Sequence, residues 1–336
     1  MQAPGFWANP PEAPGLLARL LAPFGAIYAA ASARRLARGA RVRPGVPVIC
    51  LGNLTAGGAG KTPAALMVLE RLAARGVKAH ALSRGHGGIR GREGPHRVDL
   101  SRDTAAAVGD EPLLLAAFAP TWVCPDRAAS ARAAVAAGAE ALVLDDGFQN
   151  PGLAHDLAVV VVDAEAGFGN GRCIPAGPLR EPVAVGLARA DAALLIGPPA
   201  ACERTRARWP ELARLPALEA ELRPRELGID WRGERVVAFA GIARPEKFFA
   251  TLRGLGAELV AAHPFPDHAP FEPRVLRRLE AEAERAGARL VTTDKDAVRL
   301  PPAFRGLAMP LPVTLVPRDP AALEALLDRA LGRGAP

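Results

Sequence analysis

The most informative part of the chain runs Thr55-Ala56-Gly57-Gly58-Ala59-Gly60-Lys61-Thr62. An apolar run of strand length, 46–51, precedes it, and a segment with the apolar spacing of a helix, 63–72, follows it. Strand, glycine-rich loop and helix in this order are the context of a loop that binds nucleotide phosphates, the P-loop. The pattern therefore predicts a nucleotide-dependent kinase or hydrolase. A chance glycine-rich turn is the alternative, and both the context and Gly60-Lys61-Thr62 argue against it.

The residue types in this loop suit a triphosphate. Gly57, Gly58 and Gly60 have no Cβ, so the backbone can turn its amide hydrogens towards an anion, and the helix that follows adds its positive N-terminal end. Lys61 is expected to reach the β- and γ-phosphates, and the Thr62 hydroxyl is expected to bind magnesium. Thr55 stands where the general pattern has its first glycine. We predict that the whole loop, 55–62, binds the nucleotide.

Length and composition limit the other possibilities. At 336 residues the chain exceeds the usual size of one hydrophobic core, which predicts a large domain and a smaller one. Half of the residues are hydrophobic, which argues against a disordered chain. The net charge of +7 suits an anionic substrate or an anionic membrane surface. No helix-turn-helix, zinc or aromatic stacking signature accompanies the charge, so we predict no nucleic-acid partner.

An apolar stretch, 16–31, lies near the start of the chain. It is interrupted by Arg19 and Pro23 and is followed by Arg34, Arg35 and Arg38. It is too short for a membrane span, which needs about 20 apolar residues. Two alternatives remain: a helix in the membrane interface, with its arginines against anionic headgroups, and an ordinary helix packed on the domain.

The remaining pattern predicts an α/β fold. Apolar strands at 77–82, 121–124, 141–144, 157–162 and 192–196 alternate with helices, which indicates a mainly parallel sheet covered on both faces, as in P-loop NTPases. A segment rich in proline and arginine, 197–225, ends this region. A second α/β pattern follows. We therefore predict a P-loop domain over residues 1–225 and a smaller α/β domain over 226–336.

Two further places carry chemistry. Asp145 and Asp146 end an apolar strand, where a P-loop enzyme holds magnesium, although an aspartate there can simply cap the next turn. Asp110 begins a predicted helix and is either its N-cap or a catalytic base. His268 lies in the second domain, and an aspartate and a histidine on opposite sides of a cleft can together activate a hydroxyl.

With these motifs in place, the chain resembles the tetraacyldisaccharide 4′-kinases of lipid A biosynthesis. In the first domain the resemblance runs through the P-loop and through Gly52-Asn53-Leu54, Ser83-Arg84-Gly85, Gly109-Asp110-Glu111-Pro112, Asp126-Arg127, Asp145-Asp146-Gly147-Phe148-Gln149, Gly169-Asn170-Gly171-Arg172 and Pro175-Ala176-Gly177-Pro178-Leu179-Arg180-Glu181-Pro182. In the second domain it runs through Phe239-Ala240-Gly241-Ile242, Asp267-His268 and Asp294-Lys295-Asp296-Ala297. Two positions differ from the family pattern, which usually has tyrosine at His86 and often histidine at Asn150.

The resemblance implies ATP-dependent phosphorylation of the 4′-hydroxyl of a tetraacylated glucosamine disaccharide 1-phosphate, with Mg²⁺, by a peripheral protein at the cytoplasmic face of the bacterial inner membrane. It implies that Asp110 acts as base with His268, that Lys61 takes part in catalysis, and that Asp145 and Asp146 serve magnesium and phosphate. It also implies substrate contacts from Arg84, Arg127, Gln149, Asn150, Arg180 and Glu181. For the stretch 16–31 it favours membrane contact.

The competing hypothesis is a nucleotide-dependent positioning or partition switch, whose loops also carry this glycine pattern. Such switches normally have a lysine just before the glycines, where this chain has Ala56. A switch is expected to dimerise on ATP, which a lipid kinase need not do.

Overall fold

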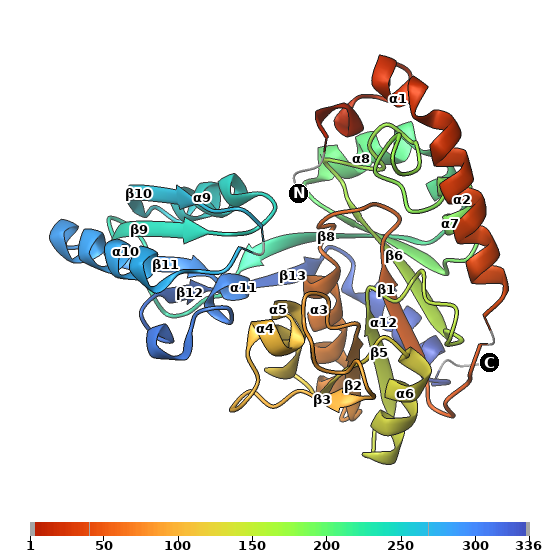
Figure 1. Cartoon of the computed structure of the whole chain (residues 1–336), viewed down its shortest axis with the longest axis horizontal. Coiled ribbons are helices and arrows are strands. Elements are labelled where there is room, and N and C mark those ends of the chain that lie inside the picture. Colours follow the sequence, from red (N-terminus) through yellow and green to blue (C-terminus); the bar gives the residue numbers. More distant parts are fainter. Residues whose placement is uncertain (1–3, 40, 268, 334–336) are drawn as a thin grey trace.

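The computed structural model describes residues 4–39, 41–267 and 269–333, so His268 lies outside the described residues. Each of its two lobes is built on its own β-sheet, and strands β8 (Ala217–Pro224) and β13 (Val313–Pro317) run between the lobes (Figure 1). The predicted α/β fold with a large, mainly parallel sheet is confirmed.

The larger lobe contains a nine-stranded sheet. Its strands, in spatial order, are β13, β8, β7 (Ala192–Ile196), β6 (Leu157–Asp163), β1 (Val48–Gly52), β5 (Ala141–Asp145), β2 (Ala79–Ser83), β4 (Thr121–Val123) and β3 (His96–Arg97). The strands from β8 to β4 are parallel to one another, and the two edge strands run antiparallel to their neighbours. Every residue of β1, β2, β5 and β7 is buried, as expected for strands covered on both faces.

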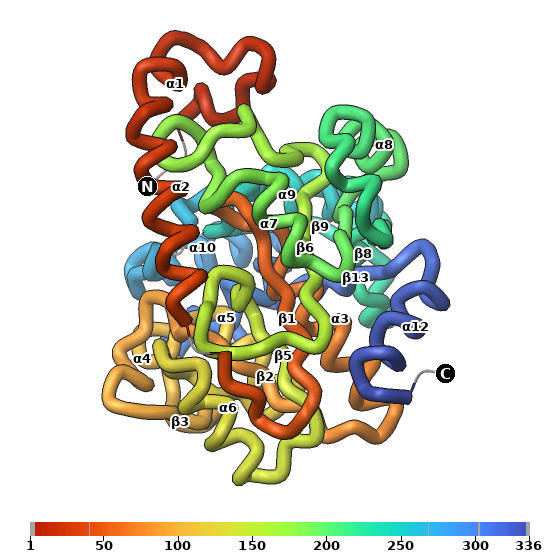
Figure 2. Tube along the Cα trace, turned by 90° about the vertical axis from the view of Figure 1, so that its right-hand side faces the viewer, coloured from red at the N-terminus to blue at the C-terminus, as the bar shows by residue number. Residues whose placement is uncertain are grey.

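Helices cover both faces of this sheet. One face packs against α3 (Lys61–Ala74), α5 (Asp110–Ala116) and α12 (Pro320–Ala330). The other packs against α6 (Arg127–Ala136), α7 (Val183–Leu187) and α8 (Pro199–Arg208). Shorter pieces complete the lobe: η1 (Gly5–Ala8), α4 (Ala105–Val108) and η2 (Pro210–Arg214). Figure 2 shows the sheet between α12 on one side and α7 on the other.

The smaller lobe repeats this layered arrangement with a four-stranded parallel sheet. Its strands, in spatial order, are β10 (Glu258–Pro264), β9 (Arg235–Ala240), β11 (Arg289–Thr293) and β12 (Met309–Leu311). Helix α9 (Pro245–Gly254) covers one face and α10 (Pro273–Ala286) covers the other. A short helix, α11 (Asp294–Ala297), follows β11 directly, and η3 (Pro302–Phe304) comes after it.

The end of the chain departs from the predicted division into residues 1–225 and 226–336. Strand β13 pairs antiparallel with β8, and Leu323 and Leu327 of α12 join the core of the large sheet. The physical reason is that β8 would otherwise present an unpaired edge, which β13 covers. The chain therefore crosses between the lobes twice, and the described part of the smaller lobe comprises residues 226–267 and 269–312.

The N-terminal stretch forms two helices, α1 (Leu16–Leu20) and α2 (Ala22–Ala37), along the outer edge of the larger lobe (Figure 1). Small residues let these helices pack closely on the lobe. Ala18 is fully buried, and a Cβ at Gly25 would lie 2.8 Å from the carbonyl oxygen of Cys173. Five large apolar side chains at the start of this stretch point outward instead. We call the exposed Leu16, Leu17, Leu20, Phe24 and Ile27 the N-terminal apolar face. Across residues 4–39, 41–267 and 269–333, no helix combines the length and the hydropathy needed to cross a bilayer.

Candidate active site

The P-loop connects β1 to α3 in a conformation that its glycines permit. Gly57 has a φ of 111° and Gly60 a φ of 86°, values that side-chain-bearing residues rarely adopt. The side-chain amide of Asn53 donates hydrogen bonds to Thr55 Oγ1 (3.2 Å) and to the Gly57 carbonyl (3.4 Å). The amide of Ala56 donates to the Pro178 carbonyl at 2.7 Å. The loop is therefore held from both sides before any ligand binds.

Lys61 and Thr62 begin α3 and face Asp145, which ends β5, and Asp146, which follows it. Thr62 Oγ1 donates a hydrogen bond to Asp145 Oδ2 at 3.0 Å, and Lys61 Nζ lies 3.9 Å from Asp146 Oδ1. The register explains this meeting, because β1 and β5 are adjacent parallel strands and their carboxyl ends share one edge of the sheet. The structure thus brings the predicted phosphate and magnesium residues together.

The two adjacent carboxylates have opposite electrostatic environments. Asp145 is 2% exposed, and burial, reinforced by Glu111, raises its pKa from 3.8 to about 7. For Asp146, burial pulls the pKa upward, but Lys61 and Arg180 outweigh it and hold the pKa below its usual value. Asp146 also has a φ of 54°, which turns the chain sharply after β5. One carboxylate is therefore costly to ionise, whereas the other is already paired with cations.

The same environment fits a magnesium ion. Asp145 Oδ1 is buried and has no hydrogen-bond partner among the described residues, while Oδ2 accepts from Thr62. A hydroxyl and a carboxylate are the hard oxygen ligands that Mg²⁺ takes, with phosphates and waters completing its shell. No cluster of three or more His, Cys, Asp or Glu residues suited to a metal occurs in the described part of the chain.

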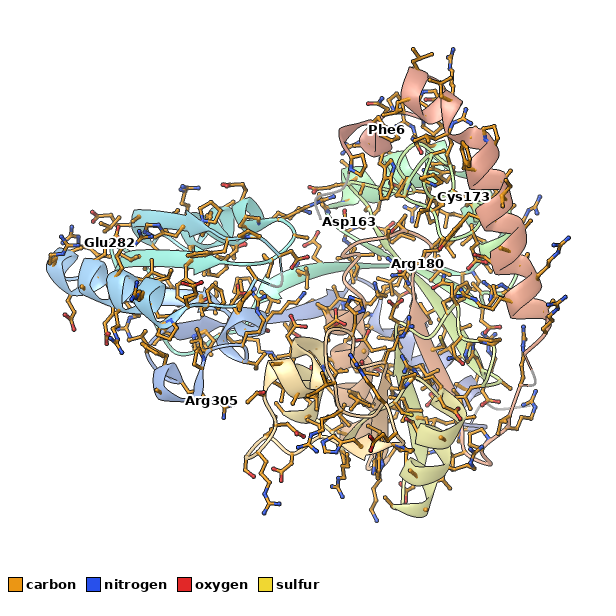
Figure 3. The ribbon with its side chains drawn as sticks, viewed as in Figure 1. Phe6, Asp163, Cys173, Arg180, Glu282 and Arg305 are labelled. Carbon is orange, nitrogen blue, oxygen red and sulfur yellow. The ribbon has the colours of Figure 1, made fainter. Side chains whose placement is uncertain are left out.

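Arg180, Gln149 and Glu181, three of the predicted substrate-binding residues, form one network beside Asp146. Arg180 Nη1 donates to Asp146 Oδ1 at 2.8 Å and to Gln149 Oε1 at 3.1 Å. Gln149 Nε2 donates to Glu181 Oε1 at 3.0 Å and to the Asn53 carbonyl at 2.8 Å. Figure 3 labels Arg180 on the larger lobe. This network connects the carboxylates to the base of the P-loop.

The other predicted substrate residues are placed differently. Arg127 is 3% exposed, its Nη1 donates to the Cys124 carbonyl, and burial lowers its pKa to about 10, with Asp145 and Asp146 opposing the shift. Arg84 is exposed. Asn150 Oδ1 accepts from the amide of Gly152 at 2.8 Å, so this side chain stabilises its own turn.

Asp110 is the first residue of α5 and does not cap that helix. The N-cap position belongs to Gly109, and Asp110 Oδ1 accepts from the neighbouring amide of Glu111 at 3.0 Å. Lys295 Nζ, from α11 of the smaller lobe, lies 3.7 Å from Asp110 Oδ2 and 3.7 Å from Asp267 Oδ1. The N-cap interpretation of Asp110 is therefore wrong. The predicted pairing with His268 remains a prediction, because that residue lies outside the described ones.

A second set of contacts brings the smaller lobe over the P-loop. Arg244 and Lys247 form ion pairs with two acidic residues at the end of β6 and just after it, Asp163 and Glu165. Figure 3 shows Asp163 on the side of the larger lobe that faces the smaller one. A Cβ at Gly58 would lie 3.9 Å from that of Ala243. The nucleotide loop and Asp110 thus both lie where the two lobes meet.

Several residues of this site were not predicted from the sequence. Lys295 stood within a quoted motif without a role, and Asn53, Glu111 and Arg189 were not identified as functional residues. Arg189 Nη2 lies 2.5 Å from Glu181 Oε2. The only signal was proximity to quoted motifs, since a single arginine or lysine has no distinctive spacing.

The chain is similar to known proteins along nearly its whole length. The family described as Tetraacyldisaccharide-1-P 4'-kinase matches residues 17–332. The tetraacyldisaccharide 4'-kinase of Dinoroseobacter shibae is 60% identical over 329 residues, which cover 98% of this chain and 97% of the relative. That of Jannaschia sp. is 56% identical over 333 residues, covering 99% and 100%. The crystal structure of LpxK from Aquifex aeolicus in complex with ATP has a TM-score of 0.69 at 24% identity, covering 94% of this chain and 100% of that one.

Proposed function

This chain belongs to the tetraacyldisaccharide-1-P 4'-kinase family, and we propose that it transfers the γ-phosphoryl group of ATP to the 4′-hydroxyl of a tetraacylated glucosamine disaccharide 1-phosphate. The observation that carries the proposal is the meeting of Thr62 with Asp145, whose other oxygen is buried without a partner among the described residues. A P-loop kinase requires this pair to hold magnesium next to the phosphates.

Each residue at the edge of the large sheet has a distinct part. Lys61 places its ammonium group where charge develops on the transferred phosphoryl group, and the loop amides around Gly57 bind the phosphates. Thr62 and Asp145 would hold Mg²⁺. Bound there, Mg²⁺ would neutralise phosphate charge as the phosphoryl group moves. Arg180 adds a second positive group beside Asp146.

Asp110 is the base in this proposal. Asp110 is 6% exposed and lies at the junction of the lobes, where Lys295 Nζ is 3.7 Å from its Oδ2. It takes the proton of the acceptor hydroxyl while that oxygen forms a bond to the γ-phosphorus and the bond from phosphorus to ADP breaks. His268 is proposed as its partner on the grounds of the family resemblance.

The N-terminal apolar face supports a place at the membrane surface. Leu16, Leu20, Phe24 and Ile27 recur at helical spacing with exposures of 59–75%, which an ordinary packed helix would avoid. Exposed arginines follow at the end of α2: Arg34 and Arg35 lie on the helix, and Arg38 is its C-cap. We propose that this face lies in the interface of an anionic bilayer, at the cytoplasmic side, where a lipid acceptor is found.

The partition-switch alternative is not favoured, because the family and the curated relatives above are described as kinases. The test is an assay with purified protein, γ-labelled ATP, Mg²⁺ and the tetraacyl disaccharide 1-phosphate in mixed micelles. Label should enter the lipid with the parent protein and not with Lys61→Ala. Label released only as inorganic phosphate, with ATP-dependent dimerisation on sedimentation, would support the switch instead.

A further inference from the structure

We propose that Arg189 is a positioning residue for phosphoryl transfer, because it ties together the two segments that carry Asp146 and Arg180. Arg189 follows α7 and is 26% exposed, and none of its contacts described below is to Lys61, Thr62 or either of the two aspartates. The proposal rests on the proposed kinase function. To that function it adds Arg189, a residue that acts by positioning other residues of the site.

One set of contacts fixes the segment after Asp146. The guanidinium of Arg189 lies over the ring of Phe148, 4.5 Å from its centroid, and Nη1 donates to the Phe148 carbonyl at 3.2 Å. Phe148 is 1% exposed, and it packs so closely on Gly52, at the end of β1, that a Cβ there would overlap it. Arg189 therefore holds the Phe148 backbone against the strand that leads into the P-loop.

The other set of contacts fixes the segment that carries Arg180. Arg189 pairs with Glu181, which is 2% exposed and would otherwise be a buried unpaired carboxylate. Glu181 Oε1 and the Asn53 carbonyl accept both hydrogens of the Gln149 amide. The Gln149 oxygen must then face Arg180, from which it accepts at 3.1 Å.

These contacts together fix the direction in which the Arg180 guanidinium points. With Gln149 oriented and Glu181 already neutralised by Arg189, Arg180 turns to Asp146. Without Arg189, Glu181 loses its ion pair while it remains bonded to Gln149 and next to Arg180 in the chain, and it competes with Asp146 for the Arg180 guanidinium. Loss of Arg189 should therefore misplace Arg180, and with it the charge beside Lys61.

The experiment is a double-mutant cycle with Arg189→Met and Arg180→Gln. Residues that support a site in this way typically cost about 10–100-fold when removed, so Arg189→Met should lower kcat at least about tenfold. If Arg189 acts through Arg180, the double variant should be no slower than Arg180→Gln alone, within about twofold. Arg189→Lys, which keeps the charge but not the two-sided hydrogen bonding, should recover part of the rate.

A matched control separates positioning from stability. Arg75→Met also removes an arginine that pairs with carboxylates, Glu324 and Asp328, but far from the phosphates. It should lower the urea midpoint of unfolding and leave kcat within about twofold, as expected for a contact outside the site. Independent, multiplicative losses in the cycle, or a kcat for Arg189→Met that matches Arg75→Met, would overturn the proposal.

The same double-mutant cycle can be measured through the Mg²⁺-dependent affinity for a nonhydrolysable ATP analogue. This measurement needs no acceptor lipid. Non-additive loss of affinity there supports the role of Arg189 even if the parent protein fails to phosphorylate the disaccharide, an outcome that would refute only the proposed function. Additive binding losses refute the role of Arg189 alone. Should Arg189→Met not fold, Arg189→Lys completes both cycles.

Discussion

Replacing Asp145 by asparagine should stabilise the ligand-free protein and abolish its activity. The carboxylate is buried, and its pKa is raised from 3.8 to about 7, with burial the largest cause. A shift of about 3 units at about 1.4 kcal/mol per unit gives an upper bound of about 4 kcal/mol of lost stability when Asp145 is ionised. Asparagine keeps an acceptor for the Thr62 hydroxyl and removes the charge. The free energy of unfolding rises because the buried, ionised carboxylate of Asp145 is costly to maintain without the ligand of this site.

The sign of the pH dependence follows from proton binding. Between the usual carboxyl pKa and about 7, the folded parent protein holds a proton that the unfolded chain has lost, so the parent loses stability as the pH rises through this window. Urea unfolding should therefore show the stabilising effect of Asp145→Asn at about pH 8, and the gap should close towards about pH 4.

A control variant at the next residue should behave in the opposite way. The pKa of Asp146 is held below its usual value by Lys61 and Arg180 despite its burial. Asp146→Asn should therefore destabilise the protein at neutral pH, and that loss should fade as the pH falls through the carboxyl range. Destabilisation by Asp145→Asn at about pH 8, or a gain that does not depend on pH, would refute the electrostatic account of this site.

Three further predictions concern separate parts of the proposal. Lys61→Ala should nearly abolish phosphoryl transfer in the labelled-ATP assay, and near-normal turnover would remove the P-loop assignment. Asp110→Asn should lower kcat far more than it weakens ATP binding, because a base acts on the acceptor and not on the nucleotide; equal loss of both, with loss of stability, would indicate a structural role. Replacing Arg34, Arg35 and Arg38 by glutamine should weaken cosedimentation with anionic liposomes and make the remainder less salt-sensitive, while activity on a short-chain soluble acceptor survives. Undiminished liposome binding at low salt would mean that another surface meets the membrane.

Most elements of the larger lobe could be predicted from patterns among residues that are close together in the sequence. The strand, loop and helix around the P-loop were predictable because glycines, a Gly60-Lys61-Thr62 end and apolar periodicity all act over short distances. Asp145 and Asp146 were predicted to face the loop because parallel strands end at one edge of a sheet, and the structure places them there.

Long-range pairings were not predictable in the same way. The antiparallel pairing of β13 with β8 joins segments about 90 residues apart, and no turn signal links them, so residues 313–331 were assigned to the wrong lobe. The ion pair of Lys295 with Asp110 and the contacts of Arg189 also depend on how the elements pack. Their charged side chains look in the sequence like any solvated arginine or lysine.

The most direct test of the central claim is the position of the new phosphate. The lipid product formed from ATP, Mg²⁺ and the tetraacyl disaccharide 1-phosphate would be purified, and its phosphorus resonances would be correlated with the sugar protons by NMR. The proposed function predicts a second phosphate monoester coupled to the proton at the 4′ carbon, with the 1-phosphate retained. A phosphate at another hydroxyl, a pyrophosphate at position 1, or an unmodified lipid would contradict it.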